Sequence, residues 1–101
     1  MKGLKTIYND PNYTMQCNGE TVFIIFHIPS ITIKKWTNFQ NLSLFSDNKY
    51  SKYLPSYIAW GNCNYHLTSV MITPTGAMEI QNQTSYDFNG KVNGSITYPM
   101  K

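Results

Sequence analysis

Hydrophobic and polar residues alternate along much of this chain, most clearly in residues 65–80. There Val70 and Ile72 are spaced two apart, and after a Pro-Thr-Gly interruption Met78 and Ile80 resume the same spacing. Because side chains on a strand point to opposite faces in turn, each run can bury one face and leave the other wet. The stretch therefore predicts a β-hairpin whose glycine supplies the positive φ that a short reversal needs.

A second hairpin is predicted near the start of the chain. Residues 13–17 alternate, Asn18-Gly19 is a strong signal for a two-residue type I′ turn, and residues 20–28 form the return strand, which Pro29 is expected to end. This return strand is apolar on both faces, with Val22, Ile24, Phe26 and Ile28 on one and Phe23 and Ile25, with His27, on the other. Such a strand is either buried on both sides within the fold or packed between subunits, and both interpretations stay open.

The rest of the chain divides into short strands separated by turn signals. A leading segment, residues 1–11, carries an edge strand at 5–8. Further strands are expected at 30–36, 38–45, 50–60, 86–88 and 91–98, with a turn at 61–64 and a second hairpin turn at Asn89-Gly90. Pro55 confines the 50–60 segment to a sheet edge or a strand start.

No segment holds the apolar spacing of an amphipathic helix, so no substantial helix is expected. Seven or eight short strands, with turn signals every 8 to 12 residues, predict an all-β fold: an antiparallel β-sandwich or a jelly-roll-like barrel. With 101 residues the chain is long enough for one domain, spanning 1–101, and too short for two.

The composition narrows the classes of partner. A hydrophobic share of 42% with only 13% charged residues indicates a folded protein rather than a disordered segment. The net charge of +3 comes from Lys alone, since the chain has no Arg. Arg is the preferred residue for bidentate phosphate and base contacts, so we expect no nucleic-acid partner.

Neither membrane insertion nor secretion is predicted. The longest apolar run, residues 22–26, is far too short to span a bilayer, and no apolar run follows the N-terminal lysines. Cys17 and Cys63 could pair if their strands were neighbours. A fold of this size with an ordinary apolar share does not depend on a disulfide, so we favour unbonded, buried thiols.

Catalytic and metal-binding groups are sparse. The acids are scattered beside turn residues, at Asp10, Glu20, Asp47, Glu79 and Asp87, and no spacing recommends an acid–base pair. Among possible zinc ligands, only Cys63 and His66 lie within finger-like spacing, which is a weak signal. His27, in mid-strand, is better explained as a hydrogen-bonded strand residue. We therefore expect no enzyme activity, no metal and no cofactor.

The candidate binding residues are aromatic and polar. Within residues 60–66, Trp60 and Tyr65 offer flat rings for the C–H groups of a sugar, and Asn62, Asn64 and His66 offer hydrogen bonds to its hydroxyls. Trp36, which follows two lysines, is a second candidate. The alternative, a core tryptophan beside an ordinary turn, remains equally open at this point.

Four motifs appear in one order along the chain, and the pattern to which they belong covers about residues 13–98: NGETVFIIF, LPSYIAW, VMITPTGAMEI and NGSITYPMK. In these patterns the chain resembles the C-terminal head domain of tail-fibre and baseplate receptor-binding proteins of phages that infect Gram-positive bacteria. The resemblance implies a compact β-sandwich that forms homotrimers and binds host cell-wall or capsular polysaccharide. It also implies a place on the virion, at the tail tip or baseplate beside other tail proteins, after synthesis in the host cytoplasm.

Such heads usually follow a trimerising neck, and no coiled-coil heptad is present, so we expect either a fragment or a small separate tip protein. Two other functions remain as alternatives. One is a single-stranded nucleic-acid-binding protein of the OB type, which also combines strands, exposed aromatics and basic charge. The other is a purely structural trimeric virion module.

Overall fold

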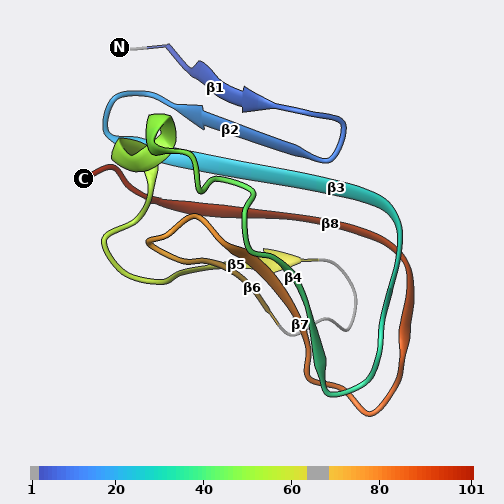
Figure 1. Ribbon diagram of the computed structural model, residues 1–101. Coiled ribbons are helices and arrows are strands. Elements are labelled where there is room, and N and C mark those ends of the chain that lie inside the picture. Colours follow the sequence, from blue (N-terminus) through green and yellow to red (C-terminus); the bar gives the residue numbers. More distant parts are fainter. Residues whose placement is uncertain (1–2, 64–68) are drawn as a thin grey trace.

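The computed structural model describes residues 3–63 and 69–101, and within these residues eight antiparallel strands form one curled sheet, a half-barrel (Figure 1). The elements are β1 (Lys5–Asn9), β2 (Tyr13–Cys17), β3 (Thr21–Ile33), β4 (Thr37–Asn41), the 3₁₀ helix η1 (Asn48–Tyr53), β5 (Ala59–Cys63), β6 (Ser69–Ile72), β7 (Met78–Asn82) and β8 (Phe88–Pro99). Their order across the sheet is β1-β2-β3-β8-β5-β6-β7-β4. The predicted all-β, antiparallel architecture without a substantial helix is confirmed.

The two longest strands, β3 and β8, pair along almost their whole length and form the long central pair of the sheet (Figure 1). Their register shifts between Ile28 and Ile31, so that Pro29 and Ser30 lie opposite Lys91 alone. Such a bulge leaves an extra residue unpaired and bends the strand. Pro29, which has no amide hydrogen to donate, is therefore accommodated inside β3. The expectation that Pro29 ends the strand was wrong.

The same pairing overturns the second predicted hairpin. Asn89 and Gly90 lie inside β8, opposite Thr32 and Ile31, rather than in a turn. Gly90 has a φ of 149° next to the bulge, so its conformational freedom serves the bend of the strand pair. Continuous pairing with β3 has replaced the local turn that the Asn-Gly signal favours.

The hairpin of β6 and β7 is confirmed. Val70 pairs with Ile80 and Ile72 with Met78, and all four side chains are buried. In the loop the Gly76 amide donates to the Thr73 carbonyl at 3.0 Å, and Gly76 has a φ of 90°. This is the three-residue hairpin in which a tight turn is followed by a left-handed glycine.

The β2–β3 hairpin also forms, but its turn lies one residue later than predicted. Cys17 pairs with Val22, the Asn18 amide donates to the Thr21 carbonyl at 3.2 Å, and between them only Gly19 has a positive φ, of 93°. The Asn18 side chain accepts the amides of Glu20 and Thr21 at 2.9 and 2.8 Å. An asparagine that caps its own turn in this way gains bonds that the type I′ turn lacks.

Strand β3 exposes one of its two apolar faces. Val22, Ile24 and Phe26 are buried in the core, whereas Ile25 is 51% exposed and Phe23 is half-buried. Burial of both faces within one copy of the chain is therefore wrong. Only packing against another molecule would cover the second face.

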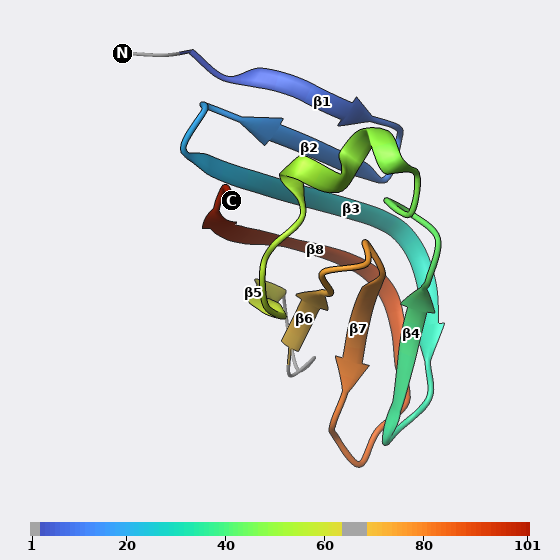
Figure 2. The same ribbon diagram turned by 60° about the vertical axis from the view of Figure 1, so that its left-hand side comes forward.

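The segment between β4 and β5 fills the open side of the curled sheet. Phe45 and Tyr50 are buried, and their rings meet the ring of Tyr8 edge to face, with centroids 5.2 and 5.8 Å from the Tyr8 centroid. Figures 1 and 2 show η1 lying over the β1–β3 part of the sheet. This region was expected to form strands at 38–45 and 50–60. Its aromatic residues instead pack as a plug, and only β4 and the start of β5 remain as strands there.

Candidate functional site

The structure separates the predicted binding residues. Trp60 is 54% exposed and Asn62 is also exposed, and both lie on the same face of β5. The predicted turn at 61–64 was wrong, because residues 61–63 belong to this strand. Trp36 is 66% exposed in the connection between β3 and β4. Asn64, Tyr65 and His66 lie outside the described residues.

Strand β5 diverges from its neighbour β8, and this divergence shapes the site. Among the described residues the two strands pair at Asn62–Ser95 and Cys63–Gly94, whereas Ala59, Trp60 and Gly61 pair with β6 on the other side. Toward its beginning, β5 therefore leaves β8. A groove of about 340 Å³ opens there between residues 55–60 and residues 97–101.

Two glycines make this corner of the sheet possible. A Cβ at Gly61 would lie 2.1 Å from the Ser95 carbonyl oxygen, and one at Gly94 would lie 2.3 Å from the Asn62 carbonyl oxygen. Neither distance is compatible with a side chain, so the close approach of β5 to β8 requires glycine at both positions. The corner holds β5 tightly against β8 at one end and leaves the groove at the other.

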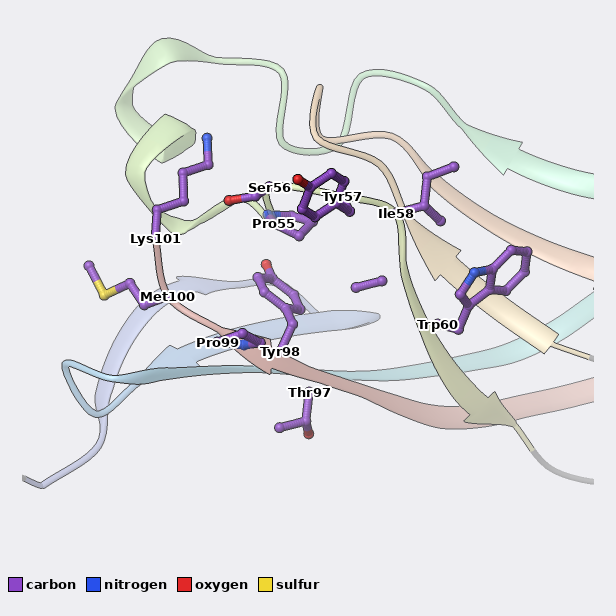
Figure 3. Close-up of a pocket in the computed structure, with 11 residues that line it drawn as sticks. Pro55, Ser56, Tyr57, Ile58, Trp60, Thr97, Tyr98, Pro99, Met100 and Lys101 are labelled. Atoms are coloured by element: carbon purple, nitrogen blue, oxygen red, sulfur yellow. The ribbon is translucent and has the colours of Figure 1, made fainter.

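Aromatic and aliphatic side chains dominate the groove. Tyr57 is 85% exposed and Ile58 is 48% exposed, and both line it together with Trp60. Figure 3 shows Pro55, Tyr57, Tyr98, Met100 and Lys101 grouped on one side of the 55–60 segment, and the Trp60 indole on its other side, at the edge of the groove and pointing away from them. Exposed flat rings beside a shallow groove can stack against the apolar face of a sugar ring.

Polar groups continue the surface beyond the groove. Asn62 faces Ser95 across the β5–β8 pair, and cross-strand partners share a face of the sheet. Ser95 and Thr97 are both exposed on that face, two residues apart. These hydroxyls were not among the predicted site residues. The outward positions of the predicted last strand, 91–98, were the signal that could have identified them.

Tyr98 forms part of the groove wall but keeps its hydroxyl for the fold. The hydroxyl donates to the Tyr53 carbonyl at 2.7 Å and ties the end of β8 to η1. Burial raises the pKa of this phenol, and the nearby Cys17 adds to the rise. Tyr98 therefore has no free hydroxyl donor to offer a ligand.

No cluster of metal-binding side chains is found in the described part of the chain. The lining residues of the groove contain no carboxylate side chain, histidine or cysteine. In residues 3–63 and 69–101, no three His, Cys, Asp or Glu side chains come together at a possible metal site. The weak Cys63–His66 signal falls partly outside these residues.

The cysteines are not joined by a disulfide. Cys17 is buried beside the Met100 sulfur, at 3.4 Å, and Cys63 is half-buried on β5. Burial raises the pKa of the Cys63 thiol and so disfavours its reactive thiolate form. The preference for thiols without a disulfide is confirmed, although only Cys17 is fully buried.

Comparisons of this chain with protein-family models, with curated proteins and with solved structures found no match. Within its described residues, no helix has the length and apolar character needed to cross a membrane. The chemistry of the groove and its surroundings is therefore the basis for the functional conclusion that follows.

Proposed function

We propose that this chain is a saccharide-binding module and that its groove between residues 55–60 and 97–101 is the binding site. The observation that carries the proposal is the exposure of Tyr57 and Trp60, at 85% and 54%, along one groove. Exposed aromatics cost solvation free energy, and stacking on a sugar ring would recover it. The exposed Asn62, two residues from Trp60 on the same face of β5, supplies hydrogen-bond partners for the hydroxyls beside that ring.

The biological setting we propose is attachment of a phage virion to its host. Support comes from the resemblance of residues 13–98 to receptor-binding head domains and from the all-β scaffold. In this setting the ligand is a host cell-wall or capsular polysaccharide, and the other partners are virion tail proteins. The protein acts at the tail tip or baseplate.

Assembly into a homotrimer belongs to the same proposal. The outer face of β3 carries Phe23 and the 51% exposed Ile25, which gives a second copy an apolar surface to cover. Several shallow sites on one particle would raise the effective affinity without any new contact. Light scattering of the purified protein should give three times the chain mass, and Ile25→Asp should reduce that mass. A wild-type protein that stays monomeric at high concentration would remove this part of the proposal.

Binding of host cells or of their purified surface polysaccharide tests the groove. Trp60→Ala and Tyr57→Ala should each weaken binding by about tenfold, since loss of one stacked ring removes about 1.4 kcal/mol. Leu4→Ala is the matched control, because Leu4 is 58% exposed and lies outside the groove. If the wild type binds and the Trp60 variant binds equally well, the site is elsewhere. If the wild type binds no saccharide, the function is wrong.

The two alternatives give different results in simple measurements. Phosphate binding by an OB-type protein must weaken steeply as salt rises, whereas stacking on a neutral sugar should hardly respond. The sheet has eight strands in its described part, against five in an OB barrel. A trimer in solution that binds no glycan would instead favour a purely structural virion module.

A further inference from the structure

The turn that joins β3 to β4 places a tryptophan where glycine is normally favoured. The Thr37 amide donates to the Lys34 carbonyl at 3.2 Å, and the Thr37 hydroxyl donates to the same carbonyl at 2.7 Å. Trp36 is the third residue of this four-residue turn and has a φ of 57°. A positive φ at that position usually selects glycine or asparagine, and a bulky aromatic residue there is rare.

The surroundings hold this strained turn in place. The Lys35 amide donates to the Asp87 carboxylate at 2.9 Å, which links the turn to the β7–β8 loop. The side-chain amide of the buried Asn82 donates to the carbonyls of Ile33 and Tyr86, each at 2.9 Å. The two connections therefore lie side by side at one end of the sheet (Figures 1 and 2).

The result is an exposed surface, here called the tip, that consists of Lys34, Lys35, Trp36 and Tyr86. Trp36 is 66% exposed and Tyr86 is 77% exposed, and both lysines are exposed as well. The Asp87 carboxylate in the adjoining β7–β8 loop accepts the Lys35 amide. The tip lies at the opposite end of β8 from the groove, about 30 Å away along the strand.

Folding does not explain a tryptophan at this position. The ring is not buried, and the backbone conformation favours a residue without a Cβ. Residues held in sparsely populated conformations by their surroundings are concentrated at functional sites, where the strain fixes the geometry of a contact. Display of the indole to a ligand accounts for both observations.

We infer that the tip is a second carbohydrate site and that it takes an acidic saccharide, such as a hexuronate oligomer. This inference rests on the proposed saccharide-binding function and adds the ligand class. Trp36 and Tyr86 supply stacking surfaces, and Lys34 and Lys35 supply positive charge for a carboxylate. Single-stranded nucleic acid shares this chemistry, but the absence of Arg and the modest charge of +3 favour the saccharide.

The two tryptophans provide the test, because the chain has only two and each belongs to one site. A ¹H–¹⁵N spectrum of the full chain shows two indole N–H signals, and Trp36→Gly identifies one by its loss. We expect an oligogalacturonate to shift the Trp36 signal and a neutral oligosaccharide from the host surface to shift the Trp60 signal. Lys34→Gln with Lys35→Gln should weaken oligogalacturonate binding by about tenfold.

Each other outcome has a definite meaning. If oligogalacturonate leaves the Trp36 signal unchanged while host saccharide shifts Trp60, the tip inference fails and the groove stands. If no saccharide shifts either signal, both fail. If a thymidine oligonucleotide shifts Trp36 at lower concentration than oligogalacturonate does, the ligand class is wrong.

Folding of the variant is checked separately. Trp36→Gly should melt about 4 °C above Trp36→Ala, because glycine relieves the positive φ that alanine keeps. Loss of oligogalacturonate binding in both variants, with Leu42→Ala unchanged, supports the tip. Leu42 is a fitting control since it is also 66% exposed and follows the other end of β4. Binding retained in both tryptophan variants overturns the inference.

Discussion

The corner between β5 and β8 requires glycine, whereas the turn between β3 and β4 has a tryptophan at a position whose backbone conformation favours glycine. At the corner, Gly61 and Gly94 stand where a Cβ would collide with backbone, at 2.1 and 2.3 Å. At the turn, Trp36 adopts a φ of 57° where glycine would be the easier residue. At the corner, only glycine fits the close packing of the two strands. At the turn, the fold accommodates tryptophan in a conformation that glycine would adopt more easily.

This difference separates two kinds of constraint on the sequence. The corner glycines are explained by packing alone, since the groove exists only because β5 approaches β8 closely at one end and diverges at the other. We attribute the tryptophan in the turn to presentation of its ring to a ligand, since the ring is largely exposed. Substitutions at the corner should therefore change stability, and substitutions at the turn should change binding.

The largest effect is expected at the corner. Gly94→Ala would place a Cβ 2.3 Å from the Asn62 carbonyl oxygen and 2.4 Å from the Phe26 ring, so either β5 or the core must move. We expect the free energy of unfolding to fall by about 3 kcal/mol, as for severe overpacking. Urea denaturation measures it. Gly3→Ala is the control, because nothing lies within 4 Å of that position, and an equal loss in both variants would contradict the packing explanation.

The next effect concerns the support of the turn. Asn82 is 1% exposed, and its amide bonds both neighbouring connections while its side-chain oxygen accepts from Thr84. Asn82→Ala leaves the buried Ile33 carbonyl without this partner, removes the bond to the Tyr86 carbonyl and should cost about 2 kcal/mol. Asn89→Ala, at an exposed position on β8, should change stability by less than about 0.5 kcal/mol. If the two variants were equally stable, the strained turn would need another source of support.

A smaller effect compares glycine with alanine at the two tryptophans. At position 36, the glycine variant should be more stable than the alanine variant by about 1 kcal/mol, because glycine adopts this positive φ without steric cost and alanine does not. At position 60, inside β5, the order should reverse by about 0.5 kcal/mol, because glycine has more entropy to lose. The same order at both positions would mean that the turn is not strained.

The smallest expected effect is a pH dependence of stability that comes from a third turn, at residues 9–13. In this turn, side chains satisfy the hydrogen bonds without backbone strain. Burial alone would raise the pKa of Asp10, but bonds from the Tyr8 hydroxyl and the amides of Asn12 and Tyr13 outweigh it and lower the pKa. This contribution to stability is present above the ordinary carboxyl pKa and is lost as pH falls through the lowered value.

The bond to Asp10 also raises the pKa of Tyr8 to about 12, with burial adding to the rise. Its contribution is complete below pH 10 and is lost as pH rises toward 12. The free energy of unfolding, measured between pH 2 and 7, should fall toward low pH, and Asp10→Asn should make that fall smaller. An unchanged fall in that variant would assign the acid sensitivity to other carboxylates.

Sequence patterns predicted the fold where local and long-range preferences agree. Val70 and Ile80 alternate with polar residues and also meet across a hairpin, so one pattern specifies both the strands and their pairing. The failures lie where distant partners decide. Pro29 and Gly90 are turn signals by themselves, but the β3–β8 pairing absorbs them in a bulge. The aromatic residues near Tyr50 predict a strand by themselves. In the structure they pack against the ring of Tyr8, which the local pattern does not reveal.

The candidate site was partly predictable for the same reason. Trp60 and Trp36 were named as candidates from their sequence neighbours, with a core tryptophan left open as an equal alternative for Trp60, and the structure leaves both rings largely exposed. The groove itself was not, because it depends on where β5 stops pairing with β8. The predicted last strand marks Thr97 as an outward position, but nothing local to Thr97 places it beside Trp60.

The most direct test of the saccharide-binding account is a crystal structure of the protein soaked with its host's surface saccharide. The account predicts a sugar ring stacked on the Trp60 indole, in the groove between residues 55–60 and residues 97–101. A sugar bound elsewhere, with the groove holding only solvent, would contradict it.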